Sequence, residues 1–171
     1  MIVTWALIIS NLIIFALGYL AGDWFNVYFG LNALFFEGAW WQPLSTMFTH
    51  GSLMHIAMNM AVLYQFGSLL ERFLGAGRFG ALYLLGGLAT SALSLSYLLY
   101  DPRVNLVGAS GAICVLLGFL AFFDRRNAKG LFIALLLMSF APLLVGVKVA
   151  WYAHIFGFAI GWAAGFFKSK F

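Results

Sequence analysis

The chain has 171 residues, of which 64% are hydrophobic and only 8% are charged, and its formal net charge is +4. Soluble domains carry about a quarter charged residues, so this composition excludes a water-soluble globular protein and indicates a protein embedded in the lipid bilayer. The positive charge is therefore expected to set orientation in the membrane rather than to bind nucleic acid. The single cysteine, Cys114, excludes an intrachain disulfide framework.

Six apolar stretches are long enough to cross a hydrocarbon core of about 30 Å as helices. They cover residues 2–22, 53–71, 79–99, 108–123, 131–147 and 150–167. The first stretch lacks a basic flank and a good cleavage site, so we expect an uncleaved helix rather than a secretory signal. The sequence thus predicts an all-α membrane protein, with residues 1–171 forming a single domain that is a bundle of six transmembrane helices.

The segment 23–52 separates the first two spans and is interrupted by Gly and Asp. It is rich in Trp, Phe and Tyr but poor in charge. Aromatic side chains of this kind settle at the membrane–water boundary, so we expect a structural loop lying in the interface.

Basic residues are distributed unequally between the two sides of the predicted bundle. Seven lie on the side of the termini: Arg72, Arg78, Arg125, Arg126, Lys129, Lys168 and Lys170. Arg103 and Lys148 lie on the other side. The positive-inside rule then predicts that both termini are cytoplasmic. The second, fourth and sixth spans therefore begin at the outer face.

Polar side chains lie near the starts of these same three spans. His55 and Asn59 are four residues apart and share one helical face, with His50 just ahead of that helix. Ser110 opens the fourth span, and His154 lies near the start of the sixth. Polar groups inside a membrane usually face the bundle interior or a wet cavity, so we expect these side chains to point inward at one depth.

Small residues recur every four positions on the fourth and sixth spans, a pattern that allows close helix packing. The two stripes are Ser110, Cys114 and Gly118 on one span, and Gly157, Gly161 and Gly165 on the other. Pairing these stripes places Ser110 level with His154.

These residues suggest acyl-transfer chemistry. Serine needs an adjacent base to become a nucleophile at neutral pH, and histidine is the usual base. Because none of the five acidic residues lies in a span beside His154, we expect a Ser110–His154 dyad rather than a triad. The Asn59 amide, the His55 ring and the Ser110 backbone N–H are candidate donors to an oxyanion.

The combination of motifs resembles the rhomboid family of intramembrane serine proteases, in its minimal six-helix bacterial form. The matching segments are His50-x4-His55-x3-Asn59, Gly108-Ala109-Ser110-Gly111 and Ala153-His154-x2-Gly157, with Gly67-x3-Glu71-x3-Gly75 similar to a structural motif that continues in Arg72. The resemblance implies that Ser110 is the nucleophile, His154 the base, and His55, Asn59 and the Ser110 amide the oxyanion hole. It assigns a supporting role to His50, and no metal or cofactor is expected.

Two positions depart from the family pattern. Trp41 is followed by Gln42 where relatives usually have arginine, so the role of that arginine is lost or supplied otherwise. Cys114 stands where many relatives carry an aromatic residue that packs on the histidine. Neither change removes a proton-transfer group, so activity is still expected.

By the same resemblance, the substrates are single-pass transmembrane proteins that reach the site sideways, past the fifth helix and the loop 141–149. The protein is expected in the inner cell membrane, with its active site open to the extracytoplasmic side. Two alternatives remain: a small transporter or a metal or haem carrier that uses His50, His55 and His154, and a non-catalytic rhomboid-like protein that binds transmembrane helices. The sequence predicts neither the physiological substrate nor the oligomeric state.

Overall fold

The computed structural model describes residues 1–144, 146 and 148–168, and within these ranges the chain forms helices and no β-strand. This confirms the predicted all-α class. The elements are α1 Ile2–Ala21, α2 Trp24–Phe29, the 3-10 turn η1 Ala33–Glu37, α3 Gln42–Ser45, α4 Leu53–Val62, the π-helix η2 Leu63–Gly67, α5 Ser68–Leu74, α6 Ala76–Tyr100, α7 Ser110–Phe123, α8 Ala128–Leu144 and α9 Trp151–Lys168.

Each predicted span contains a helix, although the boundaries differ. The span predicted at 53–71 continues to Leu74 through the π-helical turn η2. The span predicted from 108 begins only at Ser110, because Gly108 has φ +124°, which is incompatible with a right-handed helix. The span predicted at 131–147 begins earlier, at Ala128, and the helix ends at Leu144. Residues 145 and 147 of that prediction lie outside the described residues.

Three helices in the described part of the chain are long and apolar enough to cross a membrane: α1, the continuous α4–η2–α5 helix, and α6. The apolar helices α7 and α8 are shorter. With its 14 residues, α7 spans only about 21 Å at 1.5 Å per residue. This is shorter than a hydrocarbon core of about 30 Å, so the prediction of six full crossings stays a prediction.

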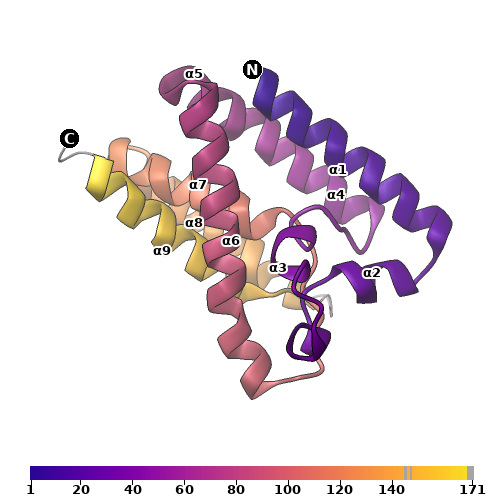
Figure 1. Ribbon diagram of the computed structural model, residues 1–171. Coiled ribbons are helices and arrows are strands. Elements are labelled where there is room, and N and C mark those ends of the chain that lie inside the picture. The colour runs from indigo at the N-terminus through magenta and orange to yellow at the C-terminus, as the bar shows by residue number, and fades with distance from the viewer. Residues whose placement is uncertain (145, 147, 169–171) are drawn as a thin grey trace.

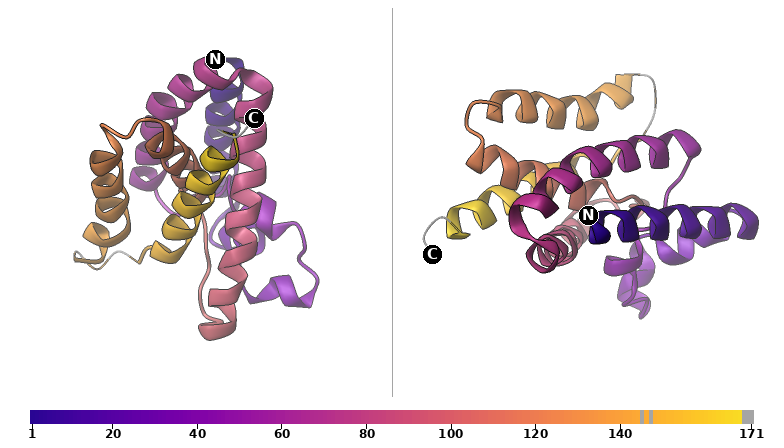
Figure 2. Two further views of the ribbon diagram at one scale, coloured as in Figure 1. Left: turned by 90° about the vertical axis from the view of Figure 1, so that its left-hand side faces the viewer. Right: turned by 90° about the horizontal axis from the view of Figure 1, so that it is seen from above.

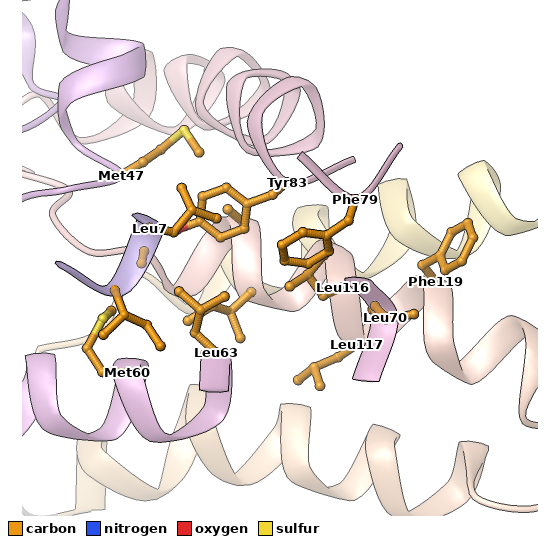
Figure 3. Close-up of a cluster of buried hydrophobic side chains, with 14 of the residues drawn as sticks. Leu7, Met47, Met60, Leu63, Leu70, Phe79, Tyr83, Leu116, Leu117 and Phe119 are labelled. Carbon is orange, nitrogen blue, oxygen red and sulfur yellow. The ribbon is translucent and has the colours of Figure 1, made fainter. Parts of the chain in front are cut away.

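The short helix α7 is the centre of the bundle. It packs against α6, α8 and α9 and also contacts α4 and η2. Figure 1 shows α1 beside α4. Figure 2 shows α8 at the periphery beyond α7, on the side opposite α1. The buried hydrophobic core joins α1, α4–α5, α6 and α7 (Figure 3), with Leu63, Phe79, Tyr83 and Leu116 fully buried.

The packing of α7 on α9 follows the predicted small-residue stripes. A Cβ atom added at Gly161 would clash with the Val115 carbonyl group, and one at Gly118 would clash with the backbone of Phe158. The two backbones are therefore in contact, which only glycine permits. This close packing aligns the first turns of α7 and α9 and brings Ser110 level with His154.

The start of α1 and the end of α9 lie at the same end of the bundle. Val3 and Thr4 contact Glu71 of α5, and Lys168 lies with its Nζ 4.5 Å from the centre of the Phe73 ring, also on α5. Figure 2 shows both ends close to this helix. Ser110, His154 and His55 lie near the first residues of α7, α9 and α4, at the other end.

Glu71, one of the predicted structural residues, caps the N-terminus of α1. Its carboxylate accepts hydrogen bonds from the backbone N–H groups of Val3 at 3.0 Å and Thr4 at 2.8 Å, and from the Thr4 hydroxyl at 2.7 Å. These N–H groups have no acceptor within α1 itself. In contrast, the exposed Arg72, the other residue of this pair, donates from Nε to the Ser68 carbonyl oxygen of its own helix.

We expect Glu71→Gln to destabilise the protein by about 1–3 kcal/mol. The substitution removes the buried negative charge and replaces one carboxylate oxygen, which accepts from a backbone N–H, by an NH₂ group that cannot accept. Thermal unfolding in detergent measures this effect. Arg72→Gln is the matched control at the adjacent, exposed position and should change stability by about 0.5 kcal/mol or less. Equal unfolding temperatures for the two variants would contradict the capping role.

Candidate active site

Ser110 and His154 meet at the contact between α7 and α9. The Ser110 Oγ lies 2.8 Å from the His154 Nε2, although the two residues are 44 positions apart in sequence. Ser110 is the first residue of α7 and His154 lies in the first turn of α9. The His154 side chain is 4% exposed. The serine hydroxyl and the imidazole are therefore within hydrogen-bonding distance in a site largely shielded from solvent.

His55 and Asn59 lie on the opposite wall, and the start of α4 sets their positions. The Ser52 hydroxyl caps this helix by accepting a hydrogen bond from the His55 backbone N–H at 3.2 Å. Asn59 follows one turn later. A Cβ added at Gly108 would lie 2.7 Å from the His55 Nε2 and 3.5 Å from the Asn59 Nδ2. Both side chains thus face Gly108, two residues before Ser110.

The Asn59 amide nitrogen is a buried donor without a hydrogen-bond partner among the described residues. An unpaired buried donor is costly, and such groups in native proteins call for an explanation, such as a ligand or a transient charge. The Ser110 backbone N–H belongs to the first turn of α7, where N–H groups lack intrahelical acceptors. These donors could together stabilise an oxyanion near Gly108.

His50 lies just before α4 and packs behind His55, with 5.0 Å between the two ring centres. Burial, together with the smaller effect of the neighbouring His55, lowers the pKa of His50 to about 3. The His50 ring is therefore neutral at physiological pH. It contributes packing to this wall of the site rather than charge.

The segment 23–52 anchors the loop that carries Gly108. Leu31 and Leu106 exchange backbone hydrogen bonds at 2.8 and 2.9 Å. The Thr46 hydroxyl donates to the Leu106 carbonyl oxygen at 2.6 Å, and the Gly108 N–H donates to the Thr46 carbonyl oxygen at 2.9 Å. This segment contains the short helices α2, η1 and α3 and acts as a clamp on the loop that leads into Ser110.

A cavity of about 910 Å³ contains the site and is lined by side chains of α4, α6, α7, α8 and α9. Ser110, His154, His55 and Asn59 all contribute to its wall. Apolar side chains continue the wall on two helices, with Met54 and Met58 on α4 and Leu137, Met138 and Ala141 on α8. The cavity is large enough for a peptide segment, since ligand sites measure about 300–1,000 Å³.

Sequence reasoning missed Ser139, which also contacts His154. The Ser139 Oγ lies 3.2 Å from the His154 Nδ1, on the side of the ring opposite Ser110. Ser139 belongs to α8 and is fully buried. One signal was present in the sequence: Ser139 is the sole polar residue of the apolar stretch 131–147, and polar residues in spans usually have a function or a partner.

The three histidines do not form a metal centre in the described part of the chain. No group of three His, Cys, Asp or Glu side chains is placed there to hold a metal ion. His50 and His55 pack ring against ring, whereas the two His154 nitrogens contact hydroxyl groups of Ser110 and Ser139.

The model of the rhomboid domain family matches residues 37–171, which is most of the chain. The chain belongs to the rhomboid family. It is 38% identical over 135 residues to RHOMBOID-like protein 4 of Arabidopsis thaliana, covering 74% of this chain and 33% of that protein. It is 36% identical over 98 residues to Rhomboid protease GluP of Bacillus subtilis, covering 57% of this chain and 18% of that protein.

A smaller rhomboid relative is matched over more of its length. Rhomboid protease GlpG of Haemophilus influenzae is 29% identical over 139 residues, which cover 76% of this chain and 70% of that protein. The chain therefore spans a third or less of the Arabidopsis and Bacillus rhomboids above, and more than two thirds of GlpG.

The two positions that depart from the rhomboid pattern both lie in defined environments. Gln42 is fully buried inside the clamp segment, where its Oε1 accepts from the Asn32 N–H at 3.2 Å and its Nε2 donates to the Tyr28 carbonyl oxygen at 3.3 Å. Gln42 thus links Tyr28 and Asn32 within the clamp segment. Cys114 is buried in the α7–α9 contact, 3.1 Å from the position of a Cβ added at Gly157.

Proposed function

We propose that this protein is an intramembrane serine endopeptidase that cleaves transmembrane segments of other proteins. The observation that carries the proposal is the 2.8 Å distance between the Ser110 Oγ and the His154 Nε2 inside the cavity of about 910 Å³. Family membership and the relatives named as rhomboid proteases support the same reaction class.

The proposed reaction has two steps. As Ser110 attacks the scissile carbonyl carbon, its proton moves to the His154 Nε2, and the carbonyl oxygen becomes an oxyanion. The imidazolium then protonates the leaving amide nitrogen, the C–N bond breaks, and an acyl-enzyme remains. Water, deprotonated by His154, hydrolyses this ester and restores the serine.

The oxyanion would be stabilised by the Asn59 amide, the His55 ring and the Ser110 backbone N–H. The unpartnered Asn59 nitrogen and the orientation of His55 toward Gly108 support this assignment. Donors fixed in a shielded site stabilise developing charge more effectively than water does, because they need no reorganisation.

Substrate would reach the site between α4 and α8. Both helices contribute apolar side chains to the cavity wall, Met54 and Met58 on α4 and Leu137, Met138 and Ala141 on α8, and the main described contacts of α8 are with α7 and α9. A substrate helix must unwind locally, because its peptide groups are engaged in its own hydrogen bonds. Single-pass transmembrane proteins fit this lateral route.

The proposal extends to the orientation of the protein in the membrane. Residues 1–171 would form one rhomboid domain with six crossings in the inner membrane and with both termini cytoplasmic. The contacts of α1 and α9 with α5 support a shared side for the two ends. The active site would then open to the extracytoplasmic side, near the outer leaflet.

Labelling with a fluorophosphonate in detergent tests the proposal. We expect covalent labelling of the wild-type protein, none for Ser110→Ala, and labelling slower by at least about 100-fold for His154→Ala, since an unactivated serine reacts poorly. Ser96→Ala, which removes an exposed hydroxyl on α6 outside the cavity, should label normally.

Labelling that persists in Ser110→Ala would contradict the assignment of the nucleophile. A folded wild-type protein that is not labelled, but still binds transmembrane helices, would favour the non-catalytic alternative.

A further inference from the structure

Two hydrogen-bonding groups hold the His154 ring from opposite sides. The Ser110 Oγ is 2.8 Å from Nε2, and the Ser139 Oγ is 3.2 Å from Nδ1. A neutral imidazole carries one proton, on either nitrogen. Only the form protonated on Nδ1 leaves a lone pair on Nε2 that can accept the proton of Ser110. The tautomer therefore decides whether His154 is able to act as the base.

The single hydrogen of the Ser139 hydroxyl is already used in a hydrogen bond within α8. The hydroxyl donates to the Leu135 carbonyl oxygen, one turn back in α8, at 2.7 Å. A hydroxyl has a single hydrogen and two acceptor lone pairs. Toward the His154 Nδ1, the Ser139 Oγ can then act only as an acceptor, and this contact requires a proton on Nδ1.

We propose that Ser139 is a positioning residue that holds His154 in the tautomer with its proton on Nδ1, the place that a carboxylate takes in a Ser–His–Asp triad. This inference rests on the proposed protease function. When the proton of Ser110 passes to Nε2, the imidazolium keeps its Nδ1–H bond to the Ser139 Oγ. Ser139 neither gains nor loses a proton, and its neutral hydroxyl stabilises the imidazolium less than a carboxylate would.

The surroundings of Ser139 suit this role. The residue is fully buried, so water does not compete for the bond, and it does not line the cavity, so it does not touch a bound substrate. No carboxylate hydrogen-bonds to His154 among the described residues. Ser139 also holds the ring from α8, a different helix from the one that carries Ser110.

Selective labelling of histidine with ¹⁵N tests the proposal directly. The chain has three histidines, and spectra of His50→Gln and His55→Gln assign the His154 signals. Imidazole nitrogen shifts distinguish protonated from unprotonated nitrogen. In the wild-type protein at neutral pH we expect the proton on the His154 Nδ1. In Ser139→Ala we expect a mixture of both tautomers.

Kinetics gives a second readout that a structural role alone would not produce. Ser139→Ala should lower kcat about three- to tenfold, the effect of one hydrogen bond, with KM unchanged because Ser139 lies outside the cavity. Ser139→Thr keeps the hydroxyl and should retain most of kcat. Ser96→Ala is the matched control, since it removes a similar bond from a serine hydroxyl to the Leu93 carbonyl oxygen on α6.

An unchanged His154 tautomer in Ser139→Ala would overturn the proposal, as would an unchanged kcat in a folded Ser139→Ala protein. The tautomer is read without any substrate. If the wild-type protein neither cleaves substrates nor reacts with fluorophosphonate, a tautomer that depends on Ser139 would show that the positioning is correct and the protease function wrong.

Discussion

Replacing Ser110 or His154 by alanine is expected to lower kcat for cleavage of a reconstituted transmembrane substrate by about 10⁴-fold or more, and the double variant should lose no more than either single variant. The two side chains form one unit through their 2.8 Å contact. Without His154 no base takes the serine proton, and without Ser110 the base has no nucleophile to activate.

Initial rates with a fluorescent single-pass substrate in liposomes measure this prediction. Binding of that substrate should be similar in all three variants, because the apolar walls on α4 and α8 stay in place. Losses that multiply in the double variant would mean that Ser110 and His154 act independently, and the proposed dyad would then be wrong. A residual rate of a few per cent in His154→Ala would indicate another base.

The proximity of Ser110 and His154 could be predicted because the packing of helices in a membrane follows a few simple rules. Polar side chains in spans face inward, and paired stripes of small residues set the register of two helices. The observed contact of Gly161 with the Val115 backbone follows from this rule. The position of the two residues at one level along the bundle was therefore predictable from spacing alone.

The clamp and the exact helix starts could not be predicted, because they depend on tertiary hydrogen bonds. Nothing local indicates that Leu31 pairs with Leu106, or that the Thr46 carbonyl oxygen accepts from Gly108. The residues just before α7, Leu106 and Val107, are as apolar as the helix itself. Hydropathy alone therefore does not predict that α7 begins at Ser110. The start of the helix is set by the positive φ of Gly108, which is seen only in the folded structure.

Ser139 was missed for a related reason. A single serine in an apolar helix usually bonds to the carbonyl oxygen one turn back, and Ser139 does so at 2.7 Å. Its second contact, with His154, depends on how α8 sits against α9. The sequence predicts no such register, because α8 lacks a stripe of small residues like those of α7 and α9.

The second large effect is expected at Gly161. A Cβ there would lie 2.7 Å from the Val115 carbonyl carbon and 2.8 Å from the Phe119 backbone nitrogen, so Gly161→Ala has to push α9 away from α7. Overpacking against backbone, which cannot rotate aside, should cost about 3 kcal/mol or more. Any displacement of α9 carries His154 with it, and a shift of about 1 Å costs roughly 100-fold in rate.

Two glycine variants separate this steric effect from a general intolerance of substitution, with unfolding temperature in detergent and cleavage rate as the readouts. Gly165→Ala meets the Phe122 side chain, which can move, and should be milder. Gly130→Ala on α8 meets no atom within 4 Å and should be neutral or stabilising by up to about 1 kcal/mol, because alanine favours the helix. If Gly161→Ala behaved like Gly130→Ala, the backbone contact between α7 and α9 would not be what brings His154 to Ser110.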